Sequence, residues 1–186
     1  MDVRDLAPSL FALGELFTRT NTILNGEHVS VSLKVRATKP GSFELVLILG
    51  QMYQSATQFL TGGFITFSVN LLALTFGASS LFGLFKRLKG QEPTEIVERA
   101  DGVTLKVGDI EVHVPTAVFR CWKDDQVKRL TQAVVLPLYK TGVDMMVIRK
   151  GSKQLEVISK QDAPSFTVEN LTTVDQGTEN ILPALT

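Results

Sequence analysis

The chain has 186 residues, of which 44% are hydrophobic and 20% charged, and its 19 Lys and Arg residues balance its 19 Asp and Glu residues. A net charge of zero excludes the broad basic surface that attracts nucleic acid, so we expect no nucleic-acid partner. The single cysteine, Cys121, excludes an internal disulfide, and with only two histidines the composition predicts neither a metal site nor a cofactor.

The first 50 residues predict a helix followed by two strands. Apolar residues recur at helical spacing in the first segment: Leu6, Leu10, Leu13 and Phe17. Asn25-Gly26 is a turn signal that ends this helix. Residues 28–38 alternate between apolar and polar side chains, which predicts a strand, and residues 42–50 are expected to form its partner. The partner strand is apolar on both faces after Glu44, as is typical of a strand covered on two sides.

Residues 45–85 contain no charged side chain. Within them, residues 64–85 would form a helix about 33 Å long, enough to cross a hydrocarbon core of about 30 Å. The sequence therefore predicts a long apolar central helix in segment 51–90. This helix either enters a membrane or is buried as a core or interface helix, and the pattern leaves both alternatives open.

Two features of this segment suggest surfaces for association. Small and polar residues recur along one side of the predicted helix: Thr66, Asn70, Ala73, Gly77 and Ser80. Such a stripe lets helices approach closely, so we expect it to mediate helix packing and oligomerisation. A basic cluster follows directly, formed by Lys86, Arg87 and Lys89. This cluster is expected to lie at a membrane surface, with complementation of the helix dipole as the alternative.

Residues 91–165 predict a mixed α+β unit. Three short strands are expected at 94–100, 103–107 and 110–114, followed by a helix at 115–122. A second helix is expected to begin after a cap at Asp124 or Asp125 and to end at Gly142, and strands 145–149 and 154–159 are expected to form a terminal hairpin. Asp101-Gly102 and Gly108-Asp109 are the expected two-residue turns of the strand region. Residues 166–186 form an acidic tail through which another protein can bind. The expected fold class is α+β, with units 1–50, 51–90, 91–165 and 166–186.

Few side chains in this sequence are of types that could carry out catalysis, and they are far apart along the chain. Cys121 lies beside Phe and Trp in a predicted helix, which is typical of core packing, although its basic neighbours could also lower its pKa. His113 is predicted to face solvent on a strand, and His28 borders a turn. The chain has no phosphate-binding glycine motif. We therefore expect a protein that is not an enzyme.

Several stretches of the chain resemble a family of uncharacterised bacterial and prophage-encoded small α+β proteins. The stretches are Leu13-Gly14-Glu15, residues 20–26, 29–35, 41–45 and 83–90, Pro137-Leu138 and Gly142-Val143-Asp144. Together they span most of residues 5 to 165. The resemblance implies a helix–strand–strand start and an apolar central segment. It also implies a setting in phage–host conflict, and it supplies no catalytic residues.

The leading hypothesis is a self-assembling, membrane-associating protein of phage–host conflict, acting in defence, superinfection exclusion or counter-defence, with residues 60–85 as the active element. The alternative is a soluble oligomeric adaptor or structural module in which the apolar helix is core or subunit interface. Both predict a homo-oligomer, because the apolar segment is large for a chain of this length. Membrane lipid is a partner in the first only. The start of the chain lacks a signal-peptide pattern, so we expect a cytoplasmic protein, with inner-membrane association as an open alternative.

Overall fold

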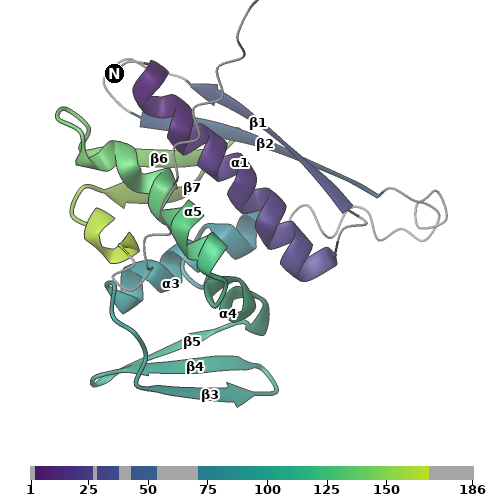
Figure 1. Ribbon diagram of the computed structural model, residues 1–186, viewed down its shortest axis with the longest axis vertical. Coiled ribbons are helices and arrows are strands. Elements are labelled where there is room, and N and C mark those ends of the chain that lie inside the picture. Colours follow the sequence, from purple (N-terminus) through teal and green to yellow (C-terminus); the bar gives the residue numbers. More distant parts are fainter. Residues whose placement is uncertain (1–2, 27–28, 38–42, 54–70, 168–186) are drawn as a thin grey trace, which may run out of the picture.

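The computed structural model describes residues 3–26, 29–37, 43–53 and 71–167. Its helices are α1 Val3–Asn25, α3 Leu81–Leu88, α4 Thr116–Trp122 and α5 Asp125–Val135, with 3-10 turns at Leu136–Tyr139 and Ala163–Phe166. Its strands are β1 Val29–Ala37, β2 Phe43–Tyr53, β3 Glu95–Arg99, β4 Gly102–Val107, β5 Ile110–Val114, β6 Met145–Lys150 and β7 Lys153–Ser159. The helices and mainly antiparallel strands confirm the α+β class (Figure 1).

The N-terminal helix and hairpin form as the sequence predicts. Leu13, Leu16 and Phe17 are fully buried on one side of α1. The helix ends at Asn25 because Gly26 takes a left-handed conformation, with φ of 71°. Strand β1 then pairs antiparallel with β2 along its whole length, from Val29 opposite Tyr53 to Ala37 opposite Leu45.

A four-stranded sheet joins the two ends of the described chain. Its order is β1-β2-β6-β7, and β2 pairs parallel with β6 from Phe43 opposite Met146 to Val46 opposite Arg149. Helices α1 and α5 pack side by side over this sheet (Figure 1). A buried hydrogen bond from Ser9 Oγ to the Val134 carbonyl links the two helices. The segments predicted as separate units, 1–50 and 91–165, therefore share one sheet and one helical layer.

The prediction of one long apolar helix is wrong for residues 71–85, the part of it that the structure describes. Residues 71–75 are helical, residues 76–80 bend, and α3 begins afresh at Leu81. Gly77 adopts φ of 123°, which is outside the range of an α-helix. Ser80 then caps α3, because its hydroxyl accepts a hydrogen bond from Gly83 N at 3.2 Å. Residues 64–70 lie outside the described residues.

No helix among the described residues combines the length and the apolar character needed to cross a bilayer. The apolar side chains of the bent segment instead pack inside the subunit. Phe76 lies 6.0 Å from Phe17 of α1 and 4.9 Å from Phe82 of α3, measured between ring centroids. Phe82 in turn lies 5.3 Å from Phe166 near the end of the described chain. These aromatic contacts connect the bent segment to α1 and to the 3-10 turn at Ala163–Phe166.

A second sheet, β3-β4-β5, lies at the far end of the molecule from β1, next to α4 (Figure 1). Its inner face is formed by five buried residues, Val103, Leu105, Val107, Val112 and Val114. The turn Gly108-Asp109 is confirmed. The first turn lies one residue earlier than predicted, at Ala100-Asp101, because Gly102 pairs with Arg99.

Candidate functional site beside strand β7

The side chain that organises the candidate site is a carboxylate on the buried face of β7. Alternation along the strand places Glu156 on the same face as Ile158, which is fully buried. Glu156 itself is only 9% exposed. A carboxylate in such a position must be paired and hydrogen-bonded, because its desolvation is otherwise too costly.

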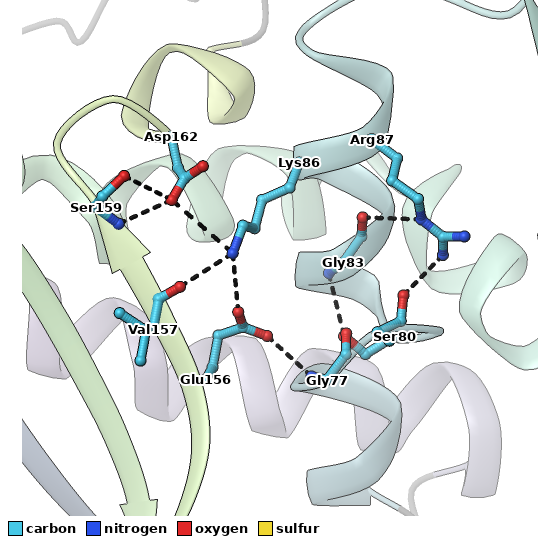
Figure 2. Close-up of polar contacts among 10 residues, drawn as sticks. Gly77, Ser80, Gly83, Lys86, Arg87, Glu156, Val157, Ser159 and Asp162 are labelled. Carbon is cyan, nitrogen blue, oxygen red and sulfur yellow. Dashed lines mark hydrogen bonds and ion pairs between the residues drawn. The ribbon is translucent and has the colours of Figure 1, made fainter. Parts of the chain in front are cut away.

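Lys86 of α3 supplies the countercharge (Figure 2). Its Nζ lies 3.1 Å from Glu156 Oε1 and donates a second hydrogen bond, of 3.0 Å, to the Val157 carbonyl. The other carboxylate oxygen, Glu156 Oε2, accepts a hydrogen bond of 2.9 Å from the backbone N–H of Gly77. We call Gly77, Lys86, Glu156, Val157 and Asp162 the Lys86 network.

Asp162 completes the network from the turn after β7. Its Oδ2 lies 3.9 Å from Lys86 Nζ and accepts hydrogen bonds from Ser159 N at 2.9 Å and Ser159 Oγ at 2.8 Å. Burial alone would raise the pKa of the Asp162 carboxyl. The two Ser159 hydrogen bonds and the charge of Lys86 outweigh burial and lower this pKa below its usual value.

The network has a clear structural role. β7 is the last strand of the four-stranded sheet among the described residues, and a free strand edge is a potential site of unwanted strand pairing. Lys86 donates a hydrogen bond to the Val157 carbonyl, and Asp162 accepts one from the Ser159 N–H. The Gly77 bond meanwhile fixes the helix break to the strand. The network thus holds the bent segment against the sheet and bonds two backbone groups of β7.

Arg87 leaves α3 on the opposite side from Lys86 (Figure 2). Its Nε donates to the Gly83 carbonyl at 3.3 Å and its second terminal nitrogen donates to the Ala78 carbonyl at 2.8 Å. A guanidinium carries about five N–H donors, so these bonds leave part of it unused. No described carboxylate pairs with Arg87, and burial lowers the pKa of its guanidinium from the ordinary value.

A wide, open pocket of about 550 Å³ is lined by the turn before α3, by α3 itself and by β7. Its wall on the helical side includes Ala78, Lys86 and Arg87, and residues 154–157 form the wall on the strand side. We call it the Arg87 pocket. Lys86 and Arg87 contribute two positive charges and Glu156 one negative charge, which leaves a net charge of +1 on the side chains that line it. The pocket therefore favours an anionic group of low charge.

The predicted packing stripe does not lie on one helix face. Ala73 is exposed on the helical turn 71–75, Gly77 lies at the break, and Ser80 is the buried cap of α3. Thr66 and Asn70 lie outside the described residues. A role of this stripe in oligomerisation stays a prediction.

The predicted basic cluster is divided among three environments. Lys86 is in the Lys86 network, Arg87 bonds to two carbonyl oxygens, and Lys89 is the exposed residue that ends α3 with φ of 51°. Contact of these residues with a membrane surface stays a prediction. Cys121 is buried, and burial raises the pKa of its thiol to about 12, which confirms the interpretation as a core residue. Among the described residues, no three His, Cys, Asp or Glu side chains gather as a possible metal site.

Comparisons of the chain with family models, curated proteins and solved structures find no match.

Glu156 and Asp162 were not predicted as site residues from the sequence. The alternation of apolar residues in 154–159 suggests that Leu155 and Val157 are the buried side chains of this strand. In the structure the buried side chains are instead those of Glu156 and Ile158. A signal was present in the uninterrupted apolar stretch before Lys86. A cation that directly follows such a stretch, in a core-packed helix, needs a nearby acid.

Proposed function

We propose that this protein is a non-catalytic adaptor that binds an acidic segment of a partner protein at the Arg87 pocket. The observation that carries the proposal is the partly desolvated Arg87 guanidinium, which has spare N–H donors and no acidic partner among the described residues. A carboxylate suits these donors because it can accept two parallel hydrogen bonds from a guanidinium.

The charge of the pocket favours a peptide carboxylate over a phosphate. Lys86 is already neutralised by Glu156, so Arg87 is the cation available to a ligand. Ala78, Leu155 and Val157 give the pocket apolar walls suited to the side chains that flank a carboxylate in a peptide. A dianionic phosphate would find only one unpaired positive charge there.

The chain supplies its own acidic probe. A synthetic peptide of residues 168–186 contains three carboxylate side chains, Glu169, Asp175 and Glu179. Titration calorimetry of this peptide with the full protein would measure binding. Arg87→Gln is expected to weaken binding about tenfold or more, because hydrogen bonds to charged groups contribute about 1.5–3 kcal/mol. Lys89→Gln is the matched control, because Lys89 is the next basic residue and does not line the pocket.

Each outcome of this titration either supports or refutes the proposed binding at Arg87. Equal affinity of the wild-type protein and Arg87→Gln would refute the proposal. Equal losses in Arg87→Gln and Lys89→Gln would show non-specific attraction and would also refute it. A peptide with Gln, Asn and Gln in place of the three acids should not bind. Stronger binding of inorganic phosphate than of the peptide would contradict the choice of a carboxylate ligand.

The membrane-associating role in phage–host conflict is the second candidate, supported by the absence of charge from residues 45–85. It requires buried side chains such as Phe76 and Phe82 to leave the core. Fractionation of the expressed protein separates the two candidates. Recovery in the detergent-free supernatant supports the adaptor, and sedimentation with membranes that is reversed only by detergent supports the second role.

A further inference from the structure

Among the described residues, β3 lies at one edge of the three-stranded sheet and pairs with β4 only. In β3 every residue except Val97 is exposed, and Val97 is half-buried. Ile96 is 47% exposed although it lies in register with Leu105 and Val112, which are buried on the inner face. The inner apolar face of this sheet therefore continues beyond the core that covers it.

The turn geometry indicates which backbone groups of β3 face outward. Arg99 and Gly102 close a two-residue hairpin turn, and such closing pairs exchange hydrogen bonds. Because the pattern alternates along an antiparallel pair, Arg99, Val97 and Glu95 direct their backbone groups toward β4. Ile96 and Glu98 direct theirs toward the open edge.

We propose that β3 pairs antiparallel with β3 of a second copy of this chain, about a two-fold axis at Val97. In this register Ile96 of each copy forms hydrogen-bonded pairs with Glu98 of the other. Glu95 of each copy then lies opposite Arg99 of the other, on the outer face of the sheet. The two three-stranded sheets become one sheet of six strands.

Charge complementarity favours a second copy of β3 as the partner strand and favours this register of pairing. Charged residues on an edge strand normally prevent pairing. The sequence Glu95-Ile96-Val97-Glu98-Arg99 is instead self-complementary, because the proposed register forms two Glu–Arg pairs. A register centred on Ile96 forms no charge pair, and a register centred on Glu98 places two Glu98 side chains in opposition.

Existing contacts within the subunit permit this pairing. Glu95 has one exposed ion pair, with Lys106 at 3.6 Å, which can persist beside a second cation. The Arg99 side chain has no ion pair or hydrogen bond with a described residue. Because β3 is only five residues long, we expect a weak dimer, with a dissociation constant on the order of 10–100 µM.

Charge reversal tests the proposal with built-in controls. Sedimentation equilibrium from about 1 µM to 1 mM would measure dimerisation of the wild type, Glu95→Arg, Arg99→Glu and the double variant. Each single reversal places like charges opposite each other twice per dimer, so we expect the dissociation constant to rise about tenfold or more. The double variant restores both pairs and should return to within about threefold of the wild type.

Three results would overturn the proposal. They are a wild-type monomer throughout this concentration range, an oligomer unaffected by the single reversals, and a double variant as weak as the single variants. Both positions are exposed, and circular dichroism would confirm that each variant is folded. The dimer goes beyond the proposed adaptor function and does not depend on it. Titration of the residue 168–186 peptide on the same variants separates the two, because a reversal that breaks only the dimer leaves binding at Arg87 intact.

Discussion

Two lysines in this molecule lie between two carboxylates, and their environments differ. Lys86 has Glu156 at 3.1 Å and Asp162 at 3.9 Å, and its side chain is 29% exposed. Lys106 has Glu95 at 3.6 Å and Glu111 at 3.9 Å, and its side chain is 45% exposed. The distances are similar, but only Lys86 also donates to a backbone carbonyl and faces an almost fully buried acid. Burial and hydrogen bonding, more than the presence of an ion pair, should decide what each lysine contributes.

The largest expected effect comes from removing the buried countercharge. Lys86→Met leaves Glu156 with only the Gly77 hydrogen bond, so we expect the free energy of unfolding to fall by about 2–3 kcal/mol. Lys106→Met is the matched control and should change it by less than about 0.5 kcal/mol, because exposed ion pairs contribute little. Urea unfolding followed by circular dichroism measures both. Equal losses in the two variants would remove the distinction between the two lysines.

A second prediction concerns how the helix break brings Lys86 to Glu156. A Cβ atom on Gly83 would lie 2.5 Å from the Ala78 carbonyl oxygen and would also meet that of Gly77. Gly83→Ala must therefore move the turn that donates to Glu156, and we expect a loss of about 2 kcal/mol.

Gly14, in the middle of α1, is the control for this change because a Cβ atom there meets nothing within 4 Å. Gly14→Ala should stabilise the protein by about 0.5–1 kcal/mol through helix propensity alone. Thermal unfolding of the two variants should thus shift in opposite directions. A stabilising effect of Gly83→Ala would show that the turn is not held in place as described.

Local sequence signals predicted most elements of this fold. Periodicity, turn residues and caps gave α1, β1, β2, the strands of the second sheet and α5, whose cap is Asp124. These signals act over a few residues, so they are readable in the chain itself. The α+β class followed from them.

Long-range features were not readable in the same way. The parallel pairing of β2 with β6 joins residues about 100 positions apart, and no local pattern encodes it. The broken helix was missed because Gly77 and Ser80 fit a helix-packing stripe as well as a helix break and a cap. The Lys86 network was missed for both reasons, since its acids come from distant β7 and its lysine followed an apparently continuous helix.

The smallest predicted effect isolates the second acid of the Lys86 network. Because the folded-state pKa of Asp162 is lowered, its carboxylate stabilises the fold above the unfolded pKa of about 3.9, and this contribution is lost as pH falls through the lower folded value. Asp162→Asn lacks this contribution at every pH.

The wild type should therefore exceed Asp162→Asn in stability most clearly at pH 7, and the difference in stability should narrow below about pH 4. Asp124, whose pKa is also lowered, is present in both proteins, so its titration cancels in the difference. Urea unfolding of both proteins across this pH range tests the prediction, and a difference that stays constant into acid would show that Asp162 acts through hydrogen-bond geometry and not through its charge.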